Sequence, residues 1–205
     1  MTIPRDHWQN AYLTQSESQV SWHEDDPQLS LELIAEYSTP QARVIDIGGG
    51  SSVLAGRLLE RGYCDVAVLD ISPAALDRAK ARIGKSRDRI RWIAADITQA
   101  DKLGSFDIWH DRAVFHFLTA PRDRQAYVFL ANKTIVIGGH LIIGTFALSG
   151  PEKCSGLPVE RYDARKLALA LGSGFRLIKE IAQTHSTPMG QTQDFIYAVF
   201  ERVIA

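Results

Sequence analysis

VIDIGGGSS, residues 44–52, is the stretch that decides the fold of this chain. An apolar run typical of a buried β-strand ends in three consecutive glycines, and Asp46 lies two positions before the first of them. Glycine adopts backbone angles that a side chain disfavours, and it lets the main chain approach a ligand closely. The stretch therefore predicts a strand followed by a nucleotide-binding turn at the edge of a sheet.

Strand and helix patterns alternate outward from this turn. Strands are predicted at residues 43–47, 66–69, 91–94, 106–110, 140–146, 175–182 and 194–203. Helices are predicted at residues 29–37, 53–61, 73–83, 121–134 and 163–171, with a loop over residues 147–162. Strands that alternate with helices form a parallel sheet covered by helices on both faces.

The end of the chain refines this fold class. The last two predicted strands are separated by the turn-rich segment THSTPMGQTQ, residues 184–193, and by no helix. They are expected to pair as a hairpin, which places one antiparallel strand in an otherwise parallel sheet. The expected fold is α/β: a doubly wound, seven-stranded, mostly parallel sheet with a C-terminal antiparallel hairpin strand, in a three-layer α/β/α sandwich.

Length and composition bound the possible partners. The 205 residues suit one domain, with an N-terminal helical cap over residues 1–40 and the core over residues 41–205. A hydrophobic fraction of 45% and a net charge of −1 give no reason to expect nucleic acid or a membrane as partner. The start of the chain, MTIPRDHWQN, is not a signal peptide, so a cytoplasmic location is predicted. Two cysteines are too few for a disulfide framework or a metal finger.

An acidic residue lies at the end of each of the first four predicted strands: Asp46, Asp70, Asp96 and Asp111. Ligands of an open parallel sheet bind at this edge. Asp70, 24 residues after Asp46, has the position in which a carboxylate accepts the ribose hydroxyls of a nucleoside. Asp96 and Ile97 would flank an adenine, one at its exocyclic amine and one at its ring face.

The glycine turn departs from the phosphate-binding motifs. The dinucleotide pattern G-x-G-x-x-G would place Val53 at its third glycine, and no Lys-Ser or Lys-Thr pair follows as in a Walker loop. The Asp46 carboxylate would oppose a phosphate and suits an ammonium or sulfonium group. The pattern predicts an adenosine that carries a cationic amino-acid tail.

Four stretches in this order, VIDIGGGSS, VLDIS, AADIT and FDIWHDRAVFHFL, resemble the motifs of class I S-adenosylmethionine-dependent methyltransferases. The resemblance covers about residues 43 to 146 by motif, and it implies a small, single-domain, Rossmann-like enzyme with S-adenosyl-L-methionine as cofactor. Ser52 stands where the family has a third glycine, and we interpret it as a helix N-cap. The resemblance implies cofactor contacts at Asp46, Gly48, Gly49, Gly50, Asp70, Ile71, Asp96 and Ile97.

The fourth motif is expected to meet both cofactor and substrate. Asp111 is a candidate for the cofactor's amino group, and His116 is the first candidate for a base, followed by His185 and Asp111. The alternative for His116 is simple packing. Metal binding by His110, Asp111 and His116 is disfavoured because their spacing is not that of a helical metal site, so no metal is expected.

Two surface features have alternative interpretations. Trp8, Tyr12 and Trp22 are expected to form a lid that contacts the cofactor, Trp22 above all, or else to pack on the sheet. The basic run from Arg78 to Arg91 is expected to be ordinary solvated surface, with an RNA-binding patch as the disfavoured alternative. The acidic HEDD segment, residues 23–26, is expected to be a solvated loop.

Three functions remain open. The favoured one is methyl transfer from S-adenosylmethionine to the nitrogen, oxygen or sulfur of a small-molecule acceptor, since the chain has no appended recognition domain. A protein lysine acceptor is the alternative within that class. A non-catalytic S-adenosylmethionine-binding protein is the second hypothesis, and a nicotinamide-dependent oxidoreductase, disfavoured by Val53 and Asp46, is the third.

Overall fold

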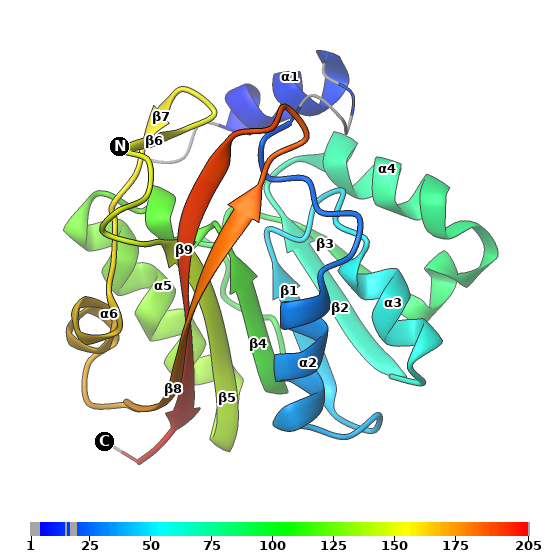
Figure 1. Cartoon of the computed structure of the whole chain (residues 1–205). Helices are drawn as coiled ribbons and strands as arrows, with labels where there is room; N and C mark the ends of the chain where they lie inside the picture. The colour runs from blue at the N-terminus through cyan, green and yellow to red at the C-terminus, as the bar shows by residue number, and fades with distance from the viewer. Residues whose placement is uncertain (1–4, 15, 17–19, 205) are drawn as a thin grey trace.

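One seven-stranded sheet organises the computed structural model of this chain, which describes residues 5–14, 16 and 20–204. The strand order is β3-β2-β1-β4-β5-β9-β8. Neighbouring strands from β3 to β5 are parallel, and β9 runs antiparallel to both β5 and β8. The predicted fold class, including the antiparallel hairpin strand, is therefore confirmed (Figure 1).

The strands have the following bounds: β1 Arg43–Ile47, β2 Asp65–Asp70, β3 Ile90–Ala94, β4 Phe106–Arg112, β5 Ile135–Phe146, β8 Phe175–Ser186 and β9 Thr192–Arg202. The main helices are α1 Arg5–Thr14, α2 Gln28–Glu36, α3 Leu54–Glu60, α4 Pro73–Ile83, α5 Pro121–Thr134 and α6 Ala164–Leu171. Ser72 caps α4 by accepting the Ala75 N–H, as a serine before Pro73 predicts. Within the described residues, no helix is long and apolar enough to cross a membrane.

Several boundaries differ from prediction. β4 continues through Asp111 to Arg112, so Asp111 lies inside the strand and not after it. β5 begins at Ile135, because Gly138 and Gly139 form an irregularity within the strand and do not precede it. The predicted loop 147–162 contains a small hairpin of β6, Lys153–Cys154, and β7, Leu157–Pro158.

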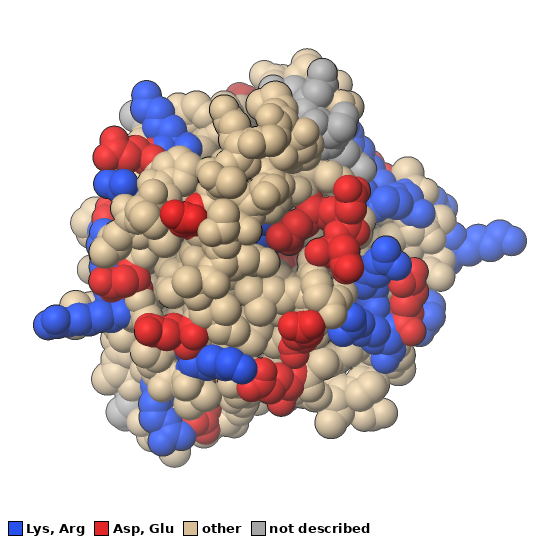
Figure 2. Space-filling model, viewed as in Figure 1, with Lys and Arg blue, Asp and Glu red and all other residues tan. Residues whose placement is uncertain are grey.

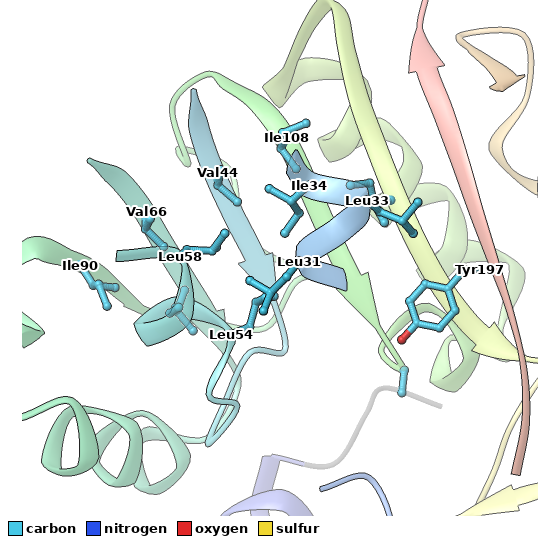
Figure 3. Packing of buried hydrophobic residues seen from close by; sticks show 14 of the residues in the cluster. Leu31, Leu33, Ile34, Val44, Leu54, Leu58, Val66, Ile90, Ile108 and Tyr197 are labelled. Carbon is cyan, nitrogen blue, oxygen red and sulfur yellow. The ribbon is translucent and has the colours of Figure 1, made fainter. Parts of the chain in front are cut away.

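The helices cover the two faces of the sheet. Side chains of α2, α3 and α4 pack on one face, whereas those of α5 and α6 pack on the other. Figure 3 shows the first of these layers, with Leu31 and Ile34 of α2 beside Val44 and Ile108 of the sheet. Because side chains alternate along a strand, each strand end presents one residue to each layer. This alternation decides which site residues face the ligand.

Candidate functional site

A cavity lies at the C-terminal edge of strands β1 to β4, on the face covered by α2 and α3. Its empty space of about 1110 Å³ includes open solvent at the mouth of the cavity. Its walls come from the segment before β1, the glycine turn and the ends of β2, β3 and β4. Of the predicted cofactor contacts, the structure brings eight to this cavity: Trp22, Asp46, Gly48, Gly49, Asp70, Ile71, Asp96 and Ile97.

Asp70 ends β2 at the cavity and is 5% exposed. One of its carboxylate oxygens accepts the Ser72 N–H at 2.8 Å, and the Gly50 N–H also donates to this carboxylate. Burial raises the pKa of Asp70 to about 7, and the nearby Asp46 carboxylate adds to the shift. A carboxylate that is desolvated in this way gains strongly from hydroxyl donors of a ligand.

Asp96 and Ile97 follow β3 on the neighbouring wall. The Asp96 carboxylate accepts the N–H and the hydroxyl of Thr98, each at 2.8 Å, and the side-chain amide of Gln99 at 3.2 Å. These three bonds orient the carboxylate, and Ile97 is buried beside it. The wall therefore combines one fixed polar group with one aliphatic surface.

The glycine turn passes close to its neighbours. Gly48 has a φ of +67°, and a Cβ at this position would lie 2.1 Å from Val114 Cγ2. Gly50 lies outside the cavity lining but supports it, since a Cβ there would lie 2.7 Å from Asp70 Oδ2. The guanidinium of Arg82 on α4 donates to the carbonyls of Ser51 and Ser52, so this member of the basic run braces the turn and is not merely solvated.

Ser52 stabilises the start of α3, although not from the predicted position. The N-cap residue is Val53, and the Ser52 hydroxyl, one position earlier, accepts the Leu54 N–H at 3.1 Å. Ser52, which stands in place of the family's third glycine, thus satisfies one of the backbone N–H groups at the start of α3. The N-cap prediction is wrong by one residue, but the local interaction that it implies is present.

Asp111 does not reach the cavity, which corrects its predicted contact with the cofactor. It is fully buried in the opposite layer, where Oδ1 accepts the Val114 N–H at 2.9 Å and Oδ2 accepts the Tyr127 hydroxyl at 2.7 Å. Burial raises the pKa of Asp111 to about 6. Asp111 organises the loop after β4, while His110 and Arg112, its neighbours in the strand, face the cavity.

His116 is also absent from the cavity lining, and the expectation that it faces the substrate is corrected. Its ring is fully buried between Phe117 and Phe146, with centroid distances of 4.5 and 4.7 Å. Burial, with the Arg112 charge, lowers the pKa of His116 to about 3, so the ring is neutral at pH 7. His185, the second candidate base, is buried outside the lining, with Nε2 3.0 Å from the Ser21 carbonyl oxygen.

Aromatic side chains of the N-terminal segment both pack and line the cavity. Trp8 contacts Trp22 and Phe117 edge to face, with centroid distances of 5.5 and 5.1 Å. Trp8 and Tyr12 are buried in the core, whereas Trp22 is half-buried and all three line the cavity. The lid and core interpretations therefore describe the same cluster. The predicted cap over residues 1–40 also includes residues 1–4, 15 and 17–19, which lie outside the described residues.

Comparison with known proteins agrees with this geometry. Residues 44–134 match the profile of a methyltransferase domain family. Residues 44–134 form a class I S-adenosylmethionine-dependent methyltransferase domain. This assignment confirms the resemblance that the four motifs indicate.

Two relatives of this methyltransferase domain illustrate its range. The malonyl-[acyl-carrier protein] O-methyltransferase of Anoxybacillus flavithermus is 33% identical over 109 residues, which are 52% of this chain and 40% of that protein. The ribosomal protein L11 methyltransferase of Thermus thermophilus is 29% identical over 163 residues, 78% of this chain and 56% of that protein. The chain thus spans about half the length, or less, of these curated relatives.

A solved structure shows the same fold over nearly the whole chain. The 1,6-didemethyltoxoflavin-N1-methyltransferase of Burkholderia thailandensis, with 1,6-didemethyltoxoflavin and S-adenosylhomocysteine bound, superposes with a TM-score of 0.71. The match covers 98% of this chain and 87% of that chain at 18% identity. At this identity the likeness concerns the fold alone.

The methyltransferase domain has a buried polar group at the cavity that sequence reasoning missed. His110 Nδ1 lies 2.7 Å from Asp46 Oδ1, and His110 Nε2 lies 2.9 Å from Ser30 Oγ. A carboxylate can only accept, so Nδ1 carries a proton and the other ring nitrogen is free to accept the serine hydroxyl. The pairing of Asp46 with His110 follows from the register of β1 and β4, which no local motif reveals.

Glu24 and Arg112 are two further lining residues that were not predicted. Figure 2 shows acidic side chains gathered over the segment between α1 and α2, which contains HEDD. Asp25 and Asp26 are exposed as expected, but the side chain of Glu24 is only 19% exposed and forms an ion pair with Arg112. Burial would raise the pKa of Glu24, yet the hydrogen bond from His185 and the Arg112 charge hold it below its usual range.

Proposed function

We propose that this protein transfers a methyl group from S-adenosylmethionine to a small-molecule acceptor. The observation that carries the proposal is the convergence of three carboxylates, Asp46, Asp70 and Asp96, with the glycine turn on one cavity. Asp70 would accept the ribose hydroxyls, Asp96 with Ile97 would hold the adenine, and the turn with Asp46 would hold the methionyl tail.

The carboxylates that line the cavity fit this cofactor and disfavour a ligand that carries phosphate. Asp46, Asp70 and Asp96 are hydrogen-bond acceptors, which match the hydroxyls, exocyclic amine and ammonium of S-adenosylmethionine. When bound, the sulfonium cofactor supplies an electrophilic methyl group. The residues of this chain would orient the acceptor against that methyl group and exclude water, with the aromatic cluster of Trp8, Trp22 and Phe117 as one wall.

A small-molecule acceptor is supported by the depth of the site. Trp8, Tyr12 and Trp22 of the N-terminal segment line the cavity together with Phe117, and aromatic rings suit an organic acceptor. The structural neighbour from Burkholderia thailandensis is an N1-methyltransferase with 1,6-didemethyltoxoflavin bound. A protein acceptor is the second candidate, because one relative is a ribosomal protein methyltransferase.

Calorimetry with S-adenosylmethionine and S-adenosylhomocysteine tests the cofactor assignment. We expect binding of both by the purified protein and at least about tenfold weaker binding by Asp70→Ala, the loss expected for charge-assisted hydrogen bonds. Asp65→Ala, at the opposite, exposed end of the same strand, is the matched control and should leave affinity unchanged. Absence of binding by the wild-type protein, or equal effects of both substitutions, would refute the assignment.

A screen of methyl acceptors separates an enzyme from a protein that only binds the cofactor. Candidate amines, alcohols, thiols and carboxylic acids are offered together with S-adenosylmethionine, and product S-adenosylhomocysteine is measured. Turnover with one of these small molecules supports the proposal. Tight cofactor binding with turnover only on protein substrates would favour the protein-acceptor alternative, and no turnover on either class would favour the non-catalytic one.

A further inference from the structure

Arg112 is a buried cation at the cavity that the proposed cofactor contacts leave without a role. It is the last residue of β4, its side chain is 12% exposed, and it lines the cavity beside His110 and Ala113. A buried guanidinium is costly to hold unless its N–H groups are satisfied. The partners of Arg112 are therefore informative.

Two of its three nitrogens are satisfied by well-separated parts of the chain. Nε donates to the Tyr197 hydroxyl on β9 at 3.0 Å, and Nη1 donates to the Trp22 carbonyl at 2.8 Å. The guanidinium also lies over the Phe195 ring, 5.1 Å from its centroid. These contacts fix the plane of the guanidinium between the N-terminal segment and β9.

The third nitrogen, Nη2, is different. It is buried, and among the described residues it has no hydrogen-bond partner. Glu24 Oε1 lies 3.2 Å away, which makes an ion pair, but the N–H groups of Nη2 are not aligned with that oxygen. A charged donor left in this state loses a hydrogen bond to water without replacing it. An acceptor that entered the cavity would supply the missing hydrogen bond.

We propose that Arg112 Nη2 binds a ligand carboxylate, and that Glu24 holds this place until the ligand arrives. A planar, permanently charged guanidinium favours a carboxylate over a neutral acceptor, because charge-assisted hydrogen bonds are about twice as strong as neutral ones. The proposal rests on the proposed function, which offers two sources of carboxylate: the methionyl tail of the cofactor and an acidic methyl acceptor.

The geometry also links this carboxylate to the cap. Nη1 of the same guanidinium holds the Trp22 carbonyl, and Trp22 packs on Trp8 and Tyr12 at the cavity wall. A ligand bound to Nη2 would therefore also stabilise the position of the N-terminal segment at the cavity. Glu24 belongs to that segment, and it is the only competing carboxylate that pairs with Arg112 in the described part of the chain.

The first experiment compares S-adenosylmethionine with decarboxylated S-adenosylmethionine by calorimetry. If the cofactor tail is the source, the wild-type protein should bind the carboxylated form about 10-fold to 100-fold more tightly, as expected for a charge-assisted pair. Arg112→Gln should bring this ratio close to one, whereas Asp70→Ala should weaken both ligands and leave the ratio intact.

Glu24→Gln separates this role from a purely structural one. Removal of the internal carboxylate should leave binding of the carboxylated ligand unchanged or tighten it, because a competitor for Nη2 is gone. If Arg112 and Glu24 only held the cap together, both substitutions would weaken both ligands by a similar factor, and that outcome would overturn the proposal.

If the wild-type protein binds S-adenosylmethionine and its decarboxylated form equally, a second experiment tests whether the methyl acceptor supplies the carboxylate. Protein saturated with S-adenosylhomocysteine is titrated with phenylacetate and with phenylacetamide, and quenching of tryptophan fluorescence is followed. A preference for the acid that Arg112→Gln abolishes assigns the carboxylate to the acceptor. No preference for the carboxylate in either arm overturns the inference, and failure to bind any cofactor overturns the proposed function as well.

Discussion

Asp46 on β1 and His110 on β4 form one hydrogen-bonded unit, with Nδ1 of the imidazole 2.7 Å from Oδ1 of the carboxylate. Both side chains are almost fully buried, and both line the cavity. A bound ammonium or sulfonium would therefore meet a carboxylate that is already oriented by a histidine, which Ser30 in turn supports. The unit couples β1 and β4 to α2.

Removal of His110 should destabilise the fold. His110→Ala leaves the buried Asp46 carboxylate without its imidazole, and loss of one partner of a buried pair costs about 3 kcal/mol or more in free energy of unfolding. Urea denaturation measures this change. Ser30→Ala removes only the outer hydrogen bond and should cost about 1 kcal/mol. Equal, small losses for both variants would contradict a stabilising role for the pair.

Asp70 should make cofactor affinity depend on pH near neutrality. Its pKa is raised to about 7 by burial, so the ionised form, which under the proposed function would accept the ribose hydroxyls, is lost as pH falls below 7. Calorimetry between about pH 5.5 and 8.5 should show affinity rising with pH in the wild-type protein, as expected for a group titrating near 7. Asp70→Asn should bind more weakly and show a flatter profile, and an unchanged profile would exclude Asp70 as the titrating group.

The raised pKa of Asp70 makes the free energy of unfolding fall with pH, whereas cofactor affinity is expected to rise with pH. A carboxyl whose folded-state pKa exceeds its unfolded value takes up protons on folding, so its contribution to stability decreases as pH rises from about 4 to 7. Above pH 7 the ionised, desolvated Asp70 opposes folding. Asp70→Asn should therefore raise the midpoint of urea unfolding at pH 8 and have little effect at pH 4, and a lower midpoint at pH 8 would contradict the assignment.

Gly48 should tolerate a side chain less well than a glycine with the same backbone angle elsewhere. Gly48→Ala adds the steric conflict with Val114 to the strain of a positive φ, whereas Gly190→Ala, at φ +77° with nothing within 4 Å, adds strain alone. Strain costs about 1–2 kcal/mol, so the Gly48 variant should unfold at lower urea than the Gly190 variant and bind cofactor more weakly. Val114→Ala in the Gly48→Ala background should recover part of the loss.

His116 should be dispensable for chemistry. Its ring is buried between two phenylalanines outside the cavity lining, and its low pKa keeps it neutral throughout the physiological range. His116→Phe should keep kcat for any accepted substrate within about threefold, a change of less than about 1 kcal/mol in the barrier, and should leave the pH profile unchanged. A loss of two orders of magnitude with intact cofactor affinity would restore His116 as a base.

Much of the fold could be predicted because its signals are local. The glycine turn, the serine-proline start of α4 and the hairpin without a helix each depend on a few adjacent residues. The glycines at 138 and 139 misled the prediction of β5, since a glycine pair can either begin a strand or, as here, interrupt one. Local pattern does not distinguish these cases.

The sequence by itself determined the positions of Asp46, Asp70 and Asp96 at successive strand ends, because parallel strands bring their carboxyl ends to one edge. Only the tertiary structure decided which side chains line the cavity. Extending β4 by two residues placed Asp111 in the opposite layer and His110 and Arg112 at the cavity, since successive side chains of a strand alternate. Likewise, strand register paired His110 with Asp46, and the return of β9 brought Tyr197 to Arg112. These contacts join residues 64 and 85 positions apart, so they depend on packing and not on any local pattern.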